Sequence, residues 1–169
     1  MRIAAICGSL QARSRNRALL ERAAAVAPAG VEVVLSDALG ELPLFNPDIE
    51  AAGETPAAVA AWRRDVSDSD ALLIACPEYG HSLPGALKNG VDWLIGSGEL
   101  DRKPVAITAS VPHESRGARG LQALWDTLQA VAAIVAWRNA IVDGPEVDAR
   151  LAALLRELAA ATAAAADEA

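Results

Sequence analysis

The feature that most constrains the fold is an alternation of short aliphatic runs with longer amphipathic segments. The aliphatic runs have the length and composition of buried strands, and they cover residues 2–7, 31–35, 71–75, 104–109 and 134–142. Apolar residues recur at helical spacing in the segments 16–27, 56–66, 83–94, 120–131 and 147–158. Strands that alternate with helices pair in parallel through right-handed crossovers. The pattern therefore predicts an α/β fold, with a five-stranded parallel sheet covered by helices on both faces.

Length and composition predict a single domain over residues 1–169. A chain of 169 residues can bury a core without disulfides, and no linker divides it. Cys7 and Cys76 fall in strand-like runs without metal-ligand spacing, so we expect buried thiols and no metal site. The formal charge of −7 opposes binding to nucleic acid. Because no apolar run approaches the ~20 residues of a membrane span and no signal peptide is evident, we expect a cytoplasmic protein.

A polar loop, residues 8–16, joins the first strand to the first helix. The first-turn N–H groups of a helix lack internal partners and carry partial positive charge, so such a loop can bind an anion without a cation. Ser9, Ser14 and Asn16 add side-chain donors at the same place. Two interpretations stay open: these serines either contact an anion, or Ser14 only caps the helix and Ser9 only turns the loop.

A second loop, residues 77–82, follows the run 71–75 and precedes a helix. It offers a rigid proline, a carboxylate, an aromatic ring, a flexible glycine and an imidazole, in the order Pro77, Glu78, Tyr79, Gly80 and His81. Ser82 is expected to cap the helix, with Pro84 in its first turn. Loops at the carboxyl ends of strands are where open α/β sheets bind ligands, so this loop is a candidate binding site.

Two further connections bear on the site. Residues 110–119 form a third loop at the carboxyl end of the fourth strand. The connection 36–55 is predicted to be a long loop, which in compact domains is usually functional or mobile. Asp37 is spaced from Gly8 roughly as a ribose-binding acid would be, but the glycine fingerprint of dinucleotide-binding folds is missing after Gly8, so we reject that role.

Two motifs resemble those of a known family. Residues 8–20 read G-S-L-x-x-x-S-x-N-R-x-L-L, and residues 77–93 read P-E-Y-x-x-S-x-P-G-x-L-K-N-x-x-D-W. Both are similar to motifs of the NADPH-dependent FMN reductases, which include quinone, azo and chromate reductases. The resemblance implies a flavodoxin-like three-layer α/β/α sandwich with strand order 2-1-3-4-5. It also implies FMN as cofactor, NADPH or NADH as electron donor, a quinone or similar small acceptor, and a homodimer or homotetramer.

The resemblance assigns roles in the first and third loops. It implies that Ser9, Ser14 and Asn16 hold the FMN phosphate and that Ser110 closes the pocket. Gln11 stands in the phosphate loop where members commonly have an arginine. After Ser110, members usually continue with glycines, whereas residues 111–113 here read V-P-H.

In the second loop, the resemblance implies contacts with the isoalloxazine ring. The residues that it places there are Pro77, Glu78, Tyr79, Gly80, His81 and Ser82. Members commonly carry asparagine and tyrosine where this chain has Gly80 and His81. Backbone N–H groups of this loop are expected to stabilise charge on the reduced ring, and His81 is a candidate proton donor to an acceptor.

Two other functions are compatible with the first loop. The spacing C-x-x-x-x-x-R-S from Cys7 to Ser14 matches low-molecular-weight tyrosine phosphatases, with Cys7 as nucleophile, Arg13 around the phosphate and Asp143 as general acid. That interpretation leaves the second motif unexplained. A flavodoxin-type electron carrier would instead bind FMN with little turnover of a nicotinamide nucleotide.

Overall fold

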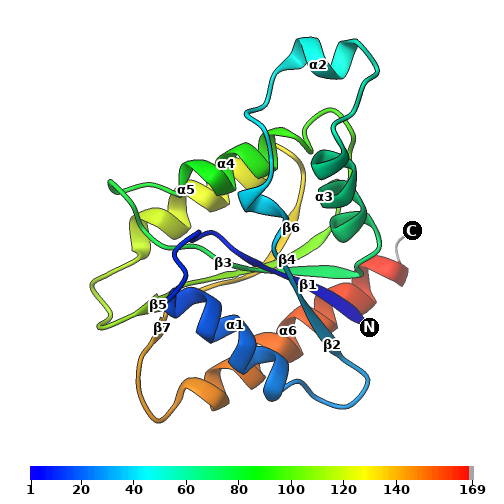
Figure 1. The fold of residues 1–169 in the computed structure, drawn as a ribbon. Coiled ribbons are helices and arrows are strands. Elements are labelled where there is room, and N and C mark those ends of the chain that lie inside the picture. Colours follow the sequence, from blue (N-terminus) through cyan, green and yellow to red (C-terminus); the bar gives the residue numbers. More distant parts are fainter. Residues whose placement is uncertain (168–169) are drawn as a thin grey trace.

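The central sheet has five parallel strands. The computed structural model describes residues 1–167. Its main strands are β1 (Arg2–Cys7), β2 (Glu32–Ser36), β3 (Ala71–Ala75), β4 (Pro104–Thr108) and β6 (Ile134–Arg138). They lie in the order β2-β1-β3-β4-β6, and each neighbouring pair is parallel (Figure 1). The predicted α/β fold and the strand order 2-1-3-4-5 are confirmed.

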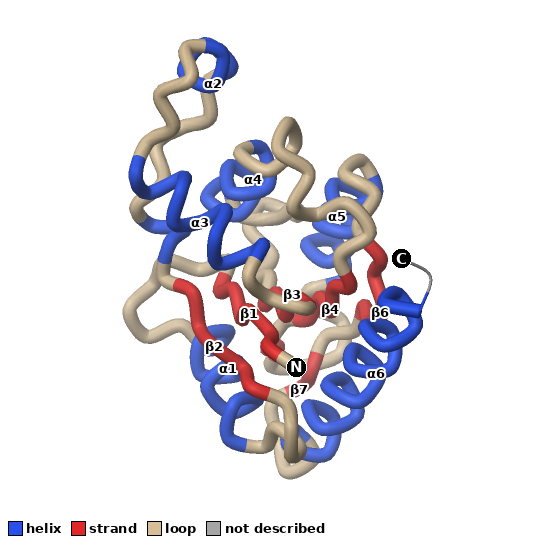
Figure 2. Tube along the Cα trace, turned by 90° about the vertical axis from the view of Figure 1, so that its right-hand side faces the viewer, coloured by secondary structure: helices blue, strands red, loops and turns tan. Residues whose placement is uncertain are grey.

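Helices cover both faces of this sheet (Figure 2). One face carries α1 (Arg15–Ala25) and α6 (Val147–Asp167), whereas the other carries α3 (Ala57–Ser67), α4 (Gly85–Asp92) and α5 (Ala118–Gln129). Each layer forms its own hydrophobic cluster against the sheet. Because helices cover both faces, every residue of β3 and β4 is buried, which explains their uninterrupted aliphatic sequences.

The connection between β2 and α3 contains ordered elements, which the sequence did not predict. A short 3-10 helix, η1 (Ala38–Gly40), is followed by α2 (Pro47–Ala51), which stands on an arm away from the sheet (Figures 1 and 2). Phe45 packs edge-on against Trp93 with ring centroids 5.1 Å apart. Arg63 pairs with Glu50 and also donates to the carbonyl oxygen of Trp93. Asn46 caps α2 locally, and the long-range contacts hold the arm against the rest of the fold.

The fifth predicted strand, residues 134–142, is two strands rather than one. After β6, the chain is irregular at Asn139 and Ala140 and then forms β7 (Ile141–Val142). β7 pairs in parallel with β5 (Ser110–Val111), so the start of the predicted third loop is also a strand. Thr108 Oγ1 donates to the carbonyl oxygen of Asn139 at 2.8 Å, at the point where the chain leaves the main sheet. This two-stranded pair carries residue 110 toward the carboxyl edge of the sheet.

The structure gives two findings on metals and membranes. Within residues 1–167, no three His, Cys, Asp or Glu side chains are grouped so that they could bind a metal ion. Over the same residues, no helix has both the length and the apolar character of a membrane span.

The first prediction concerns the core. Leu73 lies at the centre of β3 and is fully buried, so Leu73→Ala should lower the free energy of unfolding by about 2 to 5 kcal/mol. Leu44 is 83% exposed, and the matched variant Leu44→Ala should change it by less than about 0.5 kcal/mol. Denaturant titration measures both. An effect of Leu73→Ala no larger than that of Leu44→Ala would contradict the central position of β3.

Candidate functional site

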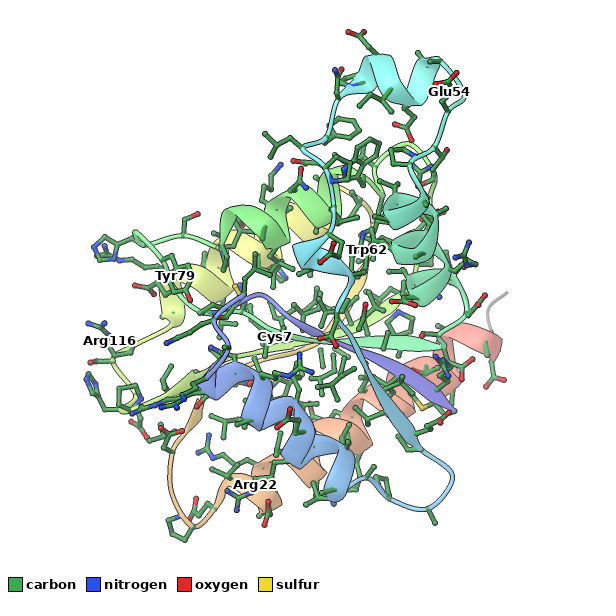
Figure 3. All side chains as sticks on the ribbon, in the orientation of Figure 1. Cys7, Arg22, Glu54, Trp62, Tyr79 and Arg116 are labelled. Carbon is green, nitrogen blue, oxygen red and sulfur yellow. The ribbon has the colours of Figure 1, made fainter. Side chains whose placement is uncertain are left out.

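Three loops meet at the carboxyl edge of the sheet, after β1, β3 and β4. Ser9 Oγ and Tyr79 Oη share a hydrogen bond of 3.1 Å, which joins the first loop to the second. Asn16 Oδ1 accepts a hydrogen bond of 2.9 Å from the Ser110 N–H, which joins the first loop to the third. Tyr79 and Arg116 lie at this same end of the molecule (Figure 3). The sequence predicted that these loops would gather, and side-chain contacts hold them together.

The first loop ends in a capped helix with free donors. Ser14 is the N-cap of α1, and its Oγ accepts from the Arg17 N–H at 3.4 Å. The next two N–H groups, of Arg15 and Asn16, donate to no other residue in the described range 1–167. A surface depression of about 380 Å³ is lined in part by Ala12, Arg13, Ser14 and Arg15. Free N–H groups in an open depression fit a phosphate group.

The remaining residues of the first loop are arranged around Ser9. The Gln11 N–H donates to Ser9 Oγ at 3.3 Å, whereas the Gln11 residue is itself exposed. Ser9, Ser14 and Asn16 are all buried polar residues. Ser14 therefore serves as a cap, and the same geometry leaves the adjacent N–H groups open to a ligand.

The second loop is a tight two-residue turn. Tyr79 and Ser82 exchange two backbone hydrogen bonds, each of 3.0 Å. Gly80 and His81 both have positive φ values, 57° and 63°, which define a type I′ turn. Ser82 is thereby committed to the turn, so the prediction that it caps the following helix is wrong. That helix begins at Gly85 with Pro84 as its N-cap and without a side-chain capping bond.

Glu78 braces the second loop against the start of α5. Its Oε2 accepts from the N–H groups of Arg119 at 3.0 Å and Gly120 at 3.3 Å, and its Oε1 lies 3.2 Å from His81 Nδ1. The hydrogen bond with His81, followed by those from the backbone, lowers the pKa of Glu78 below its ordinary range. A Cβ at Gly120 would lie 3.0 Å from Glu78 Cα, so a glycine permits this approach. Glu78 acts as a structural anion between two loops.

The third loop is held by Asp143, which lies after β7. Ser110 Oγ donates to Asp143 Oδ1 at 2.7 Å, and Arg15 donates to Asp143 Oδ2 at 3.1 Å. A small cavity of about 160 Å³ separates the second and third loops, and its lining includes Asn16, Pro77, Glu78, Ser110, Arg116 and Gly117. This cavity opens between the second loop, to which the resemblance assigned the ring, and the third loop, whose Ser110 it placed at the pocket's edge. Its mixed polar and apolar lining fits the edge of a flavin.

Both cysteines are buried free thiols, as predicted. Cys7 Sγ donates to the Ser9 carbonyl oxygen at 3.3 Å and lies 3.7 Å from Ser14 Oγ. Burial raises the pKa of the Cys76 thiol to about 12, with a further contribution from Glu78, so this thiol is neutral at physiological pH.

The family model for the NADPH-dependent FMN reductases matches residues 1–145 of this chain. The chain belongs to this family. An NAD(P)H-dependent FMN reductase of Pseudomonas aeruginosa is 38% identical over 130 residues, which cover 76% of this chain and 69% of that protein. A quinone reductase of Escherichia coli K12 is 33% identical over 121 residues, which cover 70% of this chain and 64% of that protein. An NAD(P)H:quinone oxidoreductase of Solanum tuberosum is 38% identical, and the match spans about half of its length, 49%.

Solved structures of oxidoreductases share the fold of this FMN reductase family member. The NAD(P)H:(acceptor) oxidoreductase FerB of Paracoccus denitrificans has a TM-score of 0.75 at 24% identity, over 94% of this chain and 97% of that one. An oxidoreductase of Corynebacterium diphtheriae has a TM-score of 0.68 at 26% identity, over 96% of this chain and 97% of that one. The predicted flavodoxin-like fold, family and oxidoreductase class are confirmed, and membership supports FMN and NAD(P)H as cofactors.

Sequence reasoning missed two residues that organise the site. The sequence places Gly120 near a helix start, and it offers Asp143 as a turn residue and as the acid of a phosphatase. The departure from the family motif at residues 111–113 is the sequence signal that the contacts of the third loop differ. Because Glu78 is held by the N–H groups of residues 119–120 and Ser110 is held by Asp143, no local motif could identify these contacts.

The substitution Glu78→Gln should change the stability of the protein in a pH-dependent way. A lowered pKa means that the folded protein favours the carboxylate, so this stabilisation is present above the unfolded pKa and is lost as the pH falls through the folded pKa. Glu78→Gln should therefore destabilise the protein by about 1 kcal/mol at neutral pH, and the difference from the wild type should shrink in acid.

The measurement is denaturant unfolding of both proteins from neutral to acidic pH. Glu54→Gln is the matched control, because Glu54 is exposed on the protruding arm and has no hydrogen bond or ion pair in residues 1–167 (Figure 3). A difference between Glu78→Gln and the wild type that stays constant with pH would contradict the bracing role of the carboxylate.

Proposed function

We propose that this protein binds FMN at the carboxyl edge of the sheet, where the three loops meet, and reduces quinones or similar small acceptors with NADPH or NADH. One observation carries the proposal. The free N–H groups of Arg15 and Asn16 lie at the same edge of the sheet as the turn that contains Tyr79, and a hydrogen bond from Ser9 to Tyr79 joins the two loops. The family and its quinone-reducing relatives support the same chemistry. When bound, FMN supplies the hydride and electron transfer, and the protein positions the reactants.

In this proposal the first loop holds the phosphate end of FMN. Ser9, Ser14 and Asn16 contribute hydroxyl and amide groups, and the first turn of α1 contributes its N–H groups and partial positive charge. Gln11 stands at the position where an arginine is common, and it adds a neutral amide to the loop. The phosphate is then held mainly by backbone dipoles.

The second and third loops frame the ring. The proposed contacts are Pro77, Glu78, Tyr79, Gly80, His81, Ser82 and Ser110. Within the turn, the N–H groups of Tyr79 and Ser82 bond to each other's carbonyl oxygens, whereas those of Gly80 and His81 donate to no residue in the described range. The last two N–H groups are therefore the ones available to stabilise negative charge at the ring.

His81 is the proposed proton donor to a bound acceptor. Its side chain is 71% exposed, and Glu78 lies 3.2 Å from Nδ1. When the imidazole is protonated on both nitrogens, Nδ1–H bonds to Glu78 and Nε2–H can donate its proton to a small molecule above the loop. Glu78 thus orients the imidazole while it braces the loop.

The wider properties of the protein are also proposals. We infer one domain over residues 1–169, a homodimer or homotetramer, and a cytoplasmic location. The continuous sheet and its two hydrophobic clusters support the single domain. The formal charge of −7 supports small-molecule substrates over nucleic acid as partners.

Steady-state assays separate the proposal from its two alternatives. The protein is purified with excess FMN, its visible spectrum and flavin stoichiometry are recorded, and NADPH and NADH oxidation are followed with a quinone. An electron carrier would bind flavin but turn over little nicotinamide. A phosphatase would hydrolyse an aryl phosphate and lose that activity in Cys7→Ser.

The next prediction concerns Ser14→Asp. Aspartate is as good an N-cap as serine, so α1 should keep its start, but a carboxylate about 4 Å from a phosphate costs about 1 to 4 kcal/mol. FMN affinity should fall about tenfold or more, as measured by fluorescence quenching during titration. Ser67→Asp adds the same charge at the end of α3 and should leave FMN affinity unchanged. Equal affinities for wild type and Ser14→Asp would remove the first loop from the site.

A further inference from the structure

Another hollow lies beside the third loop, apart from the two described above. It has a volume of about 380 Å³ and is bounded by residues of the third loop, α5, the end of β6 and the start of α6. Its polar lining consists of Glu114, Arg116, Gln122, Arg138, Asn139 and Arg150. None of these side chains except that of Arg116 lines the small cavity between the second and third loops.

The charge in this hollow is positive, although the whole chain is acidic. Three guanidinium groups, from Arg116, Arg138 and Arg150, face one carboxylate, that of Glu114. Within residues 1–167, none of these three arginines is within 4.0 Å of a carboxylate oxygen. Several other surface arginines are paired with carboxylates, as in Arg15–Asp143, Arg17–Asp37 and Arg22–Asp148. The hollow lined by Arg116, Arg138 and Arg150, which we call the arginine hollow, therefore has positive charge available for a ligand.

Arg138 is held in place without being neutralised. Its Nη1 donates to Gln122 Oε1 at 2.9 Å, and its guanidinium carbon lies 4.8 Å from the centroid of the Trp125 ring. Neither partner carries a formal charge, so the full positive charge of the guanidinium remains. A planar fork of N–H donors fixed in this way suits a phosphate or carboxylate group.

The arginine hollow adjoins the proposed flavin pocket. Arg116 lines both. Val111 lines the flavin side and Val142 lines the arginine hollow, and these two residues are register partners in the β5–β7 pair. A long ligand at the flavin edge can therefore reach the arginine hollow across one strand pair.

We propose that the arginine hollow binds the 2′-phosphate of NADPH while the nicotinamide lies at the flavin edge. The inference rests on the proposed function, and it names the electron donor. A phosphomonoester carries close to two negative charges and several acceptor oxygens, whereas NADH has a neutral hydroxyl at the same position. Arg150 lies beyond residue 145, where the match to the family model ends, so the family match does not itself imply this part of the hollow.

The kinetic test uses the full-length protein loaded with FMN. In Arg150→Gln, and more strongly in the double variant with Arg138→Gln, kcat/KM for NADPH should fall about tenfold while that for NADH stays within about twofold. Arg150→Gln alone removes an exposed side chain without a salt bridge, so it should fold normally. Arg156→Gln is the control, since it removes an equally exposed charge from the same helix but does not line the hollow. An unchanged kcat/KM for NADPH, or equal losses with both donors, would overturn the proposal.

A binding test separates this proposal from the proposed function. Calorimetric titration of the wild type should show that 2′,5′-ADP binds about tenfold more tightly than 5′-AMP, and that Arg150→Gln but not Arg156→Gln removes the difference. Equal binding of the two nucleotides to the wild type would overturn the arginine hollow as a 2′-phosphate site. If neither NADPH nor NADH is oxidised but 2′,5′-ADP still binds in this arginine-dependent way, the proposed function is wrong and the phosphate site remains.

Discussion

The position of each candidate site residue depends on the parallel pairing of β1, β3 and β4. In a parallel sheet the carboxyl ends of neighbouring strands lie at one edge, and the loops that leave them must turn there toward helices. This brings backbone N–H groups of the first loop beside the turn of the second. Side-chain hydrogen bonds then hold the loops together. Ser9 bonds to Tyr79, Asn16 to the backbone of Ser110, and Glu78 to the start of α5.

The two proposed anion sites differ in physical origin. At the start of α1, positive potential comes from aligned peptide groups, with Arg13 beside them and no charge from Gln11. In the arginine hollow, it comes from guanidinium groups on three different elements. Both lie at the surface, where salt screens charges, and the peptide dipoles of the first act only within the first turn of the helix.

The sequence predicted the fold well because its decisive signals are local. The aliphatic run 71–75 and the two long motifs each lie within a short segment, and so do the capping residue Ser14 and the turn residue Gly80. What it did not predict depends on distant partners. The arm before α3 is ordered by Asn89, which bonds to the backbone of Phe45 and Pro43. Residues 134–142 form two strands because the second of them pairs with β5. Ser82 does not cap the following helix because it bonds to Tyr79 in the turn.

In the turn between Tyr79 and Ser82, the backbone shape does not depend on the chemistry of the side chain at position 81. Its backbone requires a left-handed conformation at position 81, which glycine, asparagine, aspartate and histidine tolerate better than branched or bulky side chains do. Exchange among these few residue types would leave Tyr79 where it is but would change the acidity of the group above the loop. Natural variation at this one position could therefore adapt the protein to new electron acceptors without rebuilding the pocket beneath.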